Sequence, residues 1–311
     1  MQDQLQPDLE KILSKLGIND ILELLSERIS GSELNSLLLK IFSEKTKGSS
    51  ANDLFKRYRE NRFVHPATVD AILLKQLELD VLRIAAQHSA TAVQLSPVAP
   101  LGCASLVASV DQNKIISALR GTEVVSDATN LLALHISDLI KKKLLDNRES
   151  FIRLCTTHRH VRAQYFGDAP GMLTHFHLFC MVTSGVDKGS YGFEVQSLWE
   201  HIRVYRDIFK SLFHSEIEVI LSARDGYKDT DGLLKRIIKH GDENFVKVAI
   251  GEAKKDNPYY KGLQFTIKTT IQGRDYYIGD GGFVDWTQKL LNNKKERLII
   301  SAIGLDRLLI E

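Results

Sequence analysis

The chain has 311 residues, 43% of them hydrophobic and 26% charged, which is enough for one large domain and a small one without disulfide support. Lysine and arginine number 41 against 39 acidic residues, so the net charge of +2 gives no overall signature of a protein that binds nucleic acid or an acidic membrane surface. The three cysteines are widely spaced, unlike those of a small secreted domain. The N-terminus lacks a signal-peptide pattern, and no apolar run reaches the roughly 18 residues of a membrane span. We therefore expect a soluble, cytoplasmic protein.

The N-terminal part of the sequence predicts short helices. Apolar residues recur at helical spacing over residues 9–45. The stretch that follows, residues 45–53, is polar and contains Gly and Ser, which is typical of a linker. We therefore place a small helical module at residues 1–50 and the main domain at residues 51–311.

The main domain begins with a long amphipathic helix and continues as strands. The predicted apolar face of this helix, which ends near His88, consists of Ile72, Leu73, Leu77, Val81 and Ile84. Period-2 patterns indicate strands within residues 91–98, 154–166, 174–185, 216–223 and 262–282, the last with a hairpin at Gln272-Gly273. Helical patterns cover residues 129–145, 195–213, 233–240, 286–291 and 305–310. Runs of strands with helices beside them predict an α+β fold, in which helices flank a mostly antiparallel sheet.

Two of the predicted strands carry arginine and aromatic residues. Residues 158–164, HRHVRAQ, would place Arg159 and Arg162 where guanidinium groups can grip phosphates. This stretch resembles motif 2, FRHERPQ, of the histidyl-tRNA synthetases, which are class II aminoacyl-tRNA synthetases. The sequence His175-Phe176-His177 resembles the returning QFH strand of that motif. The resemblance implies that Arg159 and Arg162 bind ATP, Arg159 at the α-phosphate, and that Phe176 stacks on adenine.

The C-terminal segment and the long helix resemble the other two motifs of the family. Residues 302–309, AIGLDRLL, resemble motif 3, which is close to GFAIGLERLL. By this resemblance Gly304 lets the backbone approach the nucleotide and Arg307 binds the γ-phosphate. Residues 71–100 resemble motif 1, a helix and a strand with a proline that build the dimer interface, so the resemblance implies a homodimer.

Further segments resemble the parts of the family that bind the amino acid. VSDATNLLAL resembles the RPEGT element before a helix, with an aspartate where a glutamate holds the α-amino group. KDNPYYKG resembles RGLDYYTG, with both tyrosines retained and a lysine for the catalytic arginine, and GGFVD resembles GGRYDGL. The resemblance thus implies a site for a small amino acid-like carboxylate. Its substrate-binding residues are Asp127, Thr129, Tyr259, Tyr260, Gly281 and Gly282, and Lys255 joins Arg159 and Arg307 as a catalytic residue.

Three further positions depart from the family pattern. Val161 replaces a glutamate of motif 2 and cannot accept its hydrogen bonds, and Phe283 replaces the arginine of GGRYDGL. Leu178 stands where a glutamine reads the imidazole, so free histidine is not the expected substrate. The sequence ends two residues after Leu309, and we therefore expect no C-terminal anticodon-binding domain and no independent tRNA synthetase.

A metal cluster is an alternative use of the two motif 2 strands, because residues i and i+2 of a strand share a face. We expect packed core histidines instead, on the face opposite to Arg159 and Phe176, and no metal site. The candidate ligands of such a cluster are Cys155, His158, His160, His175, His177 and Cys180.

Three hypotheses for the function remain. The first, which the retained Arg159, Phe176 and Arg307 favour, is an enzyme that uses ATP and Mg²⁺ to adenylate a carboxylate for an acceptor other than tRNA. The second is a ligand-sensing regulator like the histidyl-synthetase-like subunit of ATP phosphoribosyltransferase, which Val161 and Lys255 favour. The third is an accessory protein that binds nucleic acid, against which the near-neutral charge counts.

Overall fold

The computed structural model describes residues 9–18, 20–164, 174–241, 246–253, 259–271 and 273–309. Its largest sheet has eight strands in the order β1-β5-β6-β11-β10-β9-β7-β8. These strands are β1 (Thr91–Ala92), β5 (Ile152–Val161), β6 (His175–Val186), β7 (Ile217–Ala223), β8 (Lys247–Ile250), β9 (Lys261–Ile271), β10 (Arg274–Val284) and β11 (Glu296–Gly304). Neighbouring strands are antiparallel except for the parallel pairs β1–β5 and β7–β8. The predicted α+β fold with a mostly antiparallel sheet is confirmed.

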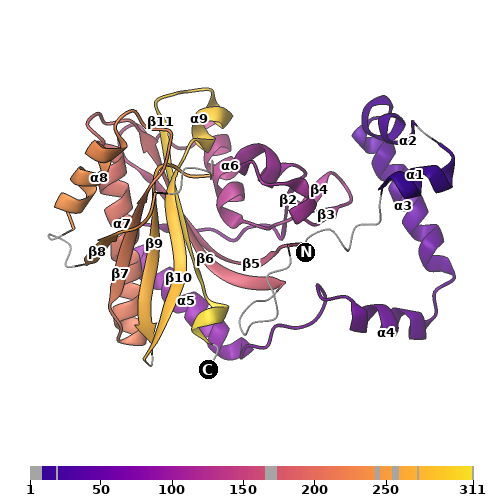
Figure 1. Ribbon diagram of the computed structural model, residues 1–311, viewed down its shortest axis with the longest axis horizontal. Helices are drawn as coiled ribbons and strands as arrows, with labels where there is room; N and C mark the ends of the chain where they lie inside the picture. The colour runs from indigo at the N-terminus through magenta and orange to yellow at the C-terminus, as the bar shows by residue number, and fades with distance from the viewer. Residues whose placement is uncertain are drawn as a thin grey trace.

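Helices cover both faces of this sheet (Figure 1). One face packs against α5 (Ala71–Gln87), α7 (Gly192–Phe213) and α8 (Thr230–Lys239) around a core that contains Phe179, Trp199 and Phe265. The other face packs against α6 (Ala128–Lys141) and α9 (Trp286–Leu291) around a second core. Among the described residues no helix is long and apolar enough to cross a membrane.

A small sheet lies beside α6. Its strands, in the order β2-β4-β3, are β2 (Val98–Pro100), β3 (Ser117–Ala118) and β4 (Thr122–Val124). Two short helical segments, η2 (Cys103–Val107) and η3 (Gln112–Lys114), lie between β2 and β3 in the chain. The buried carboxylate of Glu123 on β4 accepts hydrogen bonds from the backbone N–H groups of Gly102 and Ala104, each at 2.8 Å, and thereby holds the turn that starts η2.

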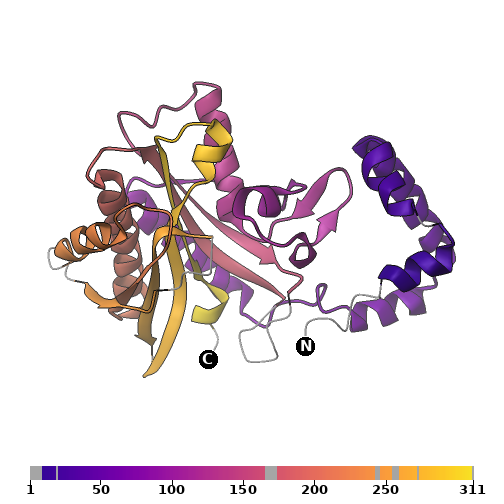
Figure 2. The same cartoon turned by 45° about the horizontal axis from the view of Figure 1, so that its top comes forward.

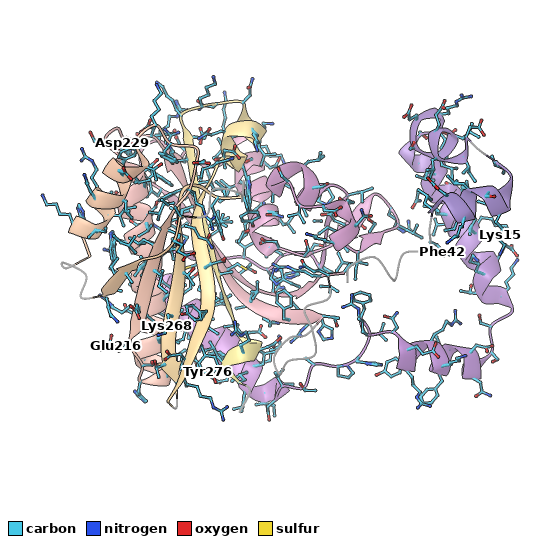
Figure 3. All side chains as sticks on the ribbon, in the orientation of Figure 1. Lys15, Phe42, Glu216, Asp229, Lys268 and Tyr276 are labelled. Atoms are coloured by element: carbon cyan, nitrogen blue, oxygen red, sulfur yellow. The ribbon has the colours of Figure 1, made fainter. Side chains whose placement is uncertain are left out.

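The N-terminal helices form an arm beside the main body (Figure 2). They are α1 (Leu9–Leu16), α2 (Ile21–Glu23), η1 (Leu24–Arg28), α3 (Gly31–Lys47) and α4 (Ala51–Glu60). None of their described residues is buried, and Phe42, labelled in Figure 3, is 50% exposed. The side chains of the body instead fill the space between the sheet and its helices (Figure 3).

Helix α5 buries a different face from the one predicted at its start. The carboxylate of Asp70 accepts hydrogen bonds from the backbone N–H groups of Ile72 and Leu73, which fixes the first turn. The side chains of these two residues are 81% and 57% exposed, so the prediction was wrong for both. The core face consists of Leu74, Leu77, Glu78, Val81, Ile84 and Ala85.

The segment after β11 is a single 3₁₀ turn, η5 (Asp306–Leu308), and not the helix predicted over residues 305–310. The backbone N–H of Leu305 donates to the carbonyl of His177 at 2.9 Å. The buried carboxylate of Asp306 accepts the backbone N–H of His177 at 2.8 Å. Two bonds to β6 therefore hold this segment against the sheet and shape it into a tight turn.

A buried polar network joins α7 to the middle of the sheet. The His201 ring lies between the hydroxyls of Thr183 on β6, at 2.9 Å, and Ser301 on β11, at 2.6 Å. The Tyr205 hydroxyl contacts the same Ser301 oxygen at 2.6 Å. Burial lowers the pKa of His201 to about 3, so this imidazole is neutral at physiological pH.

Candidate functional site

A cavity of about 820 Å³ opens on the α6 side of the large sheet. Its volume lies in the range of small-molecule sites, roughly 300 to 1,000 Å³. Strands β6, β9, β10 and β11, the start of α6 and the segment after β5 all contribute to its lining. Eight of the residues predicted to bind ligands line it, namely Asp127, Thr129, Arg162, Phe176, Tyr259, Tyr260, Gly304 and Arg307.

Asp127 caps the N-terminus of α6 and faces this cavity. One carboxylate oxygen accepts the backbone N–H of Thr129 at 2.9 Å and its hydroxyl at 2.6 Å, and the other accepts the Tyr259 hydroxyl at 2.7 Å. Burial alone would raise the pKa of Asp127, but the Arg162 guanidinium and the hydrogen bond from Thr129 hold the pKa below its usual value. Asp127 is therefore an anion inside the cavity wall, which suits a ligand that carries a cationic amine.

His160 holds the start of α6 from the neighbouring strand. The backbone N–H of Ala128 donates to Nε2 of His160 at 2.8 Å, so this nitrogen is an acceptor and carries no proton. Burial lowers the pKa of His160 to about 3, against the attraction of Asp127. A neutral imidazole and the Asp127 carboxylate thus fix the first turn of the helix together.

Arg162 and Phe176 form a cationic and aromatic wall of the cavity. The Nε of Arg162 donates to the carbonyl of Ser126 at 3.0 Å, and the guanidinium carbon lies 5.0 Å from the centre of the Phe176 ring. At the exposed rim, Nη1 of Arg307 donates to the carbonyl of Tyr277 at 2.8 Å. Guanidinium groups can bind phosphates and an aromatic ring can stack on a planar base, so these residues could hold a nucleotide.

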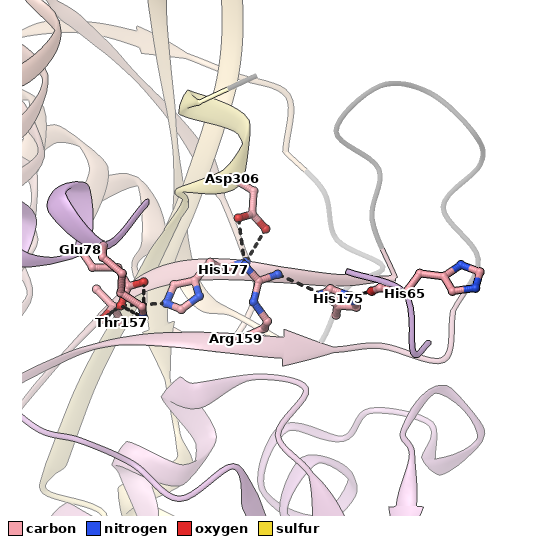
Figure 4. A network of polar contacts seen from close by, with 8 residues as sticks. His65, Glu78, Thr157, Arg159, His175, His177 and Asp306 are labelled. Carbon is pink, nitrogen blue, oxygen red and sulfur yellow. Dashed lines mark hydrogen bonds and ion pairs between the residues drawn. The ribbon is translucent and has the colours of Figure 1, made fainter. Parts of the chain in front are cut away.

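Arg159 lies outside this cavity, on the opposite face of the sheet. The antiparallel register pairs Arg159 with His177 and His160 with Phe176, so Arg159 and Phe176 do not share a face as predicted. The guanidinium of Arg159 reaches Oδ1 of Asp306 at 3.3 Å and Nδ1 of His175 at 2.9 Å (Figure 4). These contacts tie β5 and β6 to the turn after β11, which is a structural role.

The same network continues to α5 (Figure 4). The His177 ring lies 3.4 Å from a carboxylate oxygen of Glu78, and burial lowers the pKa of His177 to about 4. The Thr157 hydroxyl donates to the same carboxylate at 3.2 Å. Both His177 and Thr157 lie on the α5 side of the sheet, with Arg159.

The strand register also separates the candidate metal ligands. Cys155, His175 and His177 lie on the α5 side of the strand pair, and His158, His160 and Cys180 lie on the α6 side. No group of three or more His, Cys, Asp or Glu residues that could hold a metal ion occurs within the described ranges. The six residues therefore cannot form one cluster.

The two predicted glycines of β10 shape the cavity from behind. A Cβ on Gly282 would come within 2.7 Å of the Tyr260 ring, so this glycine allows the ring to lie against the strand. A Cβ on Gly281 would come within 2.5 Å of Phe265 and Ser301, on the core side of the sheet. Neither glycine lines the cavity. Lys255, the predicted catalytic lysine, lies outside the described residues.

Sequence reasoning missed a second acidic group in the cavity. Asp280 on β10 accepts the Tyr260 hydroxyl and the side-chain amide of Gln264, each at 3.2 Å, and the Arg224 guanidinium donates to the oxygen of the same amide. Partial desolvation by the cavity walls raises the pKa of Asp280, and the charge of Asp127 adds to this effect. The sequence signal is an aspartate between two strand glycines, Gly279 and Gly281.

Comparisons with known proteins find likeness in structure alone, since no family model and no curated sequence matches the chain. A structure titled as the RNA-binding domain of threonyl-tRNA synthetase from Cryptosporidium parvum Iowa II matches with a TM-score of 0.59 and 10% identity, over 76% of this chain and 62% of the other. An ATP phosphoribosyltransferase regulatory subunit/histidyl-tRNA synthetase from Bacillus halodurans C matches with a TM-score of 0.58 and 12% identity, over 80% of this chain and 82% of the other. Apo histidyl-tRNA synthetase from S. aureus matches with a TM-score of 0.55 and 10% identity, over 78% of this chain and 71% of the other.

The chain spans less than two thirds of the length of the threonyl-tRNA synthetase structures that it matches. At such low identity the likeness concerns the fold, and it agrees with the fold that the three sequence motifs predict. The chain therefore has the fold of the class II aminoacyl-tRNA synthetases and of the histidyl-synthetase-like regulatory subunit.

Proposed function

We propose that the cavity binds ATP together with an amino acid-like carboxylate and joins the two as an acyl-adenylate for an acceptor other than tRNA. The observation that carries this proposal is the presence of an ionised, half-buried Asp127 together with Arg162 and Phe176 in one cavity of about 820 Å³. Asp127 offers a partner for an α-amino group. Arg162, Phe176 and Arg307 offer partners for the nucleotide.

The reaction needs no general base. The substrate carboxylate attacks the α-phosphorus in line, a carboxyl oxygen–phosphorus bond forms, and the bond to the leaving pyrophosphate breaks. Arg162, fixed by its bond to the Ser126 carbonyl, would neutralise charge near the α-phosphate, in place of Arg159. Mg²⁺ generally binds through one or two carboxylates and the phosphates. We propose that it enters with the triphosphate, because the described residues offer no cluster of three ligands.

A second candidate is a ligand sensor without chemistry, as in the regulatory subunit named above. The observation that favours it is the position of Arg159, whose guanidinium is engaged by Asp306 and His175 on the far face of the sheet. One of the arginines that the motifs predict for ATP is thus used for structure. The sensor would bind an amino acid at Asp127 without activating it.

Exchange of radiolabelled pyrophosphate into ATP, measured with each amino acid, separates the two candidates. Exchange that depends on one amino acid supports the ligase, and binding of an amino acid without exchange supports the sensor. Arg162→Ala should abolish exchange, and the matched control Arg274→Ala, at an exposed arginine on β10, should leave it unchanged. Absence of both ATP binding and amino acid binding in calorimetry would refute both candidates.

A further inference from the structure

The carboxylate of Asp280 accepts fewer and longer hydrogen bonds than that of Asp127. Asp127 accepts three hydrogen bonds at 2.6 to 2.9 Å and lies beside the Arg162 guanidinium. Asp280 accepts two, both at 3.2 Å and both from neutral groups, the Tyr260 hydroxyl and the Gln264 amide. Of the two cavity carboxylates, Asp280 thus keeps more capacity to accept a further donor, since an ionised carboxylate has about four acceptor sites.

The positive charges near Asp280 act on it from a distance: the Arg162 guanidinium opposes the rise of its pKa. No ion pair involves Asp280 within the part of the chain that the structure describes, and the Arg224 guanidinium reaches it only through the intervening Gln264 amide. Asp280 is exposed to the open cavity, and partial desolvation by the cavity walls raises its pKa. A ligand that fills the cavity would cover this carboxylate, and a cationic group on the ligand would then avoid the cost of burying an unpaired charge.

The surface near Asp280 is suited to an aliphatic chain. The rings of Tyr259 and Tyr260 meet edge to face, with centroids 4.8 Å apart, and form one wall. Ile300 and Ala302 on β11 and Leu178 on β6 also line the cavity. Methylene groups of a ligand can pack on this surface while charged groups at their two ends reach two different carboxylates.

We propose that the substrate is a basic amino acid, whose α-amino group binds Asp127 and whose side-chain ammonium or guanidinium binds Asp280. This inference rests on the proposed function, since it names the substrate class of the same cavity. It assigns a specificity role to Asp280 and a supporting role to Tyr260 and Gln264, which orient its carboxylate. An apolar amino acid of the same length would leave Asp280 without its cationic partner.

Calorimetry with the full-length protein and Mg²⁺-ATP tests the inference, with lysine, ornithine and arginine compared with norleucine and norvaline. Norleucine keeps the chain of lysine without its ammonium, so the ratio of their affinities isolates the charge. We expect the best basic amino acid to bind roughly 10- to 100-fold more tightly than its uncharged analogue, the range for a hydrogen bond to a charged group. Comparison of the affinities for lysine, ornithine and arginine then shows whether the site prefers an ammonium or a guanidinium group.

Asp280→Asn should reduce this preference to within about twofold, since a neutral amide cannot balance a cation, and should leave ATP affinity unchanged. The matched control is Asp275→Asn on the same strand, whose exposed carboxylate pairs with Lys268 at 2.7 Å. This control should keep the full preference.

Equal binding of lysine and norleucine to the wild type, or a preference that survives in Asp280→Asn, would overturn the inference. So would the absence of binding by every amino acid tested. Tight binding of a basic amino acid without pyrophosphate exchange would support the inference and reject the adenylation chemistry. The two proposals can therefore fail separately.

Discussion

Replacing Arg159 by alanine should destabilise the protein and leave its affinity for ATP nearly unchanged. The guanidinium makes two contacts, with Asp306 at 3.3 Å and His175 at 2.9 Å. Asp306 lines the cavity, but Arg159 itself does not. A hydrogen bond to a charged group contributes about 1.5 to 3 kcal/mol. Because 32% of the Arg159 side chain is exposed, solvent screens the pair, and we expect the free energy of unfolding to fall by about 1 to 2 kcal/mol.

Denaturant unfolding measures the first quantity and calorimetry with ATP the second. Asp306→Asn should cause a comparable loss of stability, and the double variant should lose less than the sum, since both single changes remove the same pair. Arg162→Ala serves as the contrast and should weaken ATP binding by roughly tenfold or more. Arg159→Ala with normal stability and a tenfold loss of ATP affinity would refute the structural role and restore the role that motif 2 implies.

Other changes test the rest of the molecule. Arg307→Ala should weaken ATP binding roughly tenfold or more, as measured by calorimetry. The exposed start of α5 should lie in a homodimer interface, so that aspartates at both Ile72 and Leu73 convert a dimer to a monomer in sedimentation; a monomeric wild type would contradict this. Free histidine should give no more pyrophosphate exchange than other amino acids that lack a permanently charged side chain, because Leu178 offers its imidazole no hydrogen bond. The pKa of His201, about 3 when folded, lies below its unfolded value near 6.5, so the unfolded chain binds the extra proton. As the pH is lowered from 6.5 to 3, this group should therefore reduce the free energy of unfolding by up to about 1.4 kcal/mol per pH unit. In denaturant unfolding at a series of pH values, His201→Gln should make the free energy of unfolding depend less on pH.

The sequence pattern predicted the elements of the fold well and their faces less well. The hairpin between β9 and β10 is where the turn residues predicted it, with Gly273 at a φ of 77°, although Gln272 lies outside the described residues. Leu77, Val81 and Ile84 on α5 are buried as predicted, but Ile72 and Leu73 are exposed. Helical periodicity gives an apolar sector whose edges depend on the packing partner, and that partner is distant in sequence.

Tertiary contacts also explain why the end of the chain differs from its predicted structure. The apolar pattern of residues 305–310 predicted a helix, but β6 takes both the Leu305 N–H and the Asp306 carboxylate as hydrogen-bond partners. Asp306 accepts a backbone N–H that lies 129 positions away in the chain, and such a distant partner leaves no pattern in the sequence around Asp306. Asp280 was missed for a similar reason, since its two partners, Tyr260 and Gln264, identify it as a cavity residue only once β9 and β10 pair.

The contrast between Asp127 and Arg159 shows which site residues a sequence can place. Asp127 caps a helix, and its partner Thr129 lies two residues away, so the local pattern is enough to fix the carboxylate at the start of α6. The direction of Arg159 depends instead on which residue of β6 stands opposite. A shift of one residue in strand register moves every side chain to the other face. Because the register pairs Arg159 with His177, Arg159 does not line the cavity, whereas Arg162, directly after β5, does. Of the two arginines that motif 2 predicts for ATP, Arg162 is therefore the one that we propose for the phosphates.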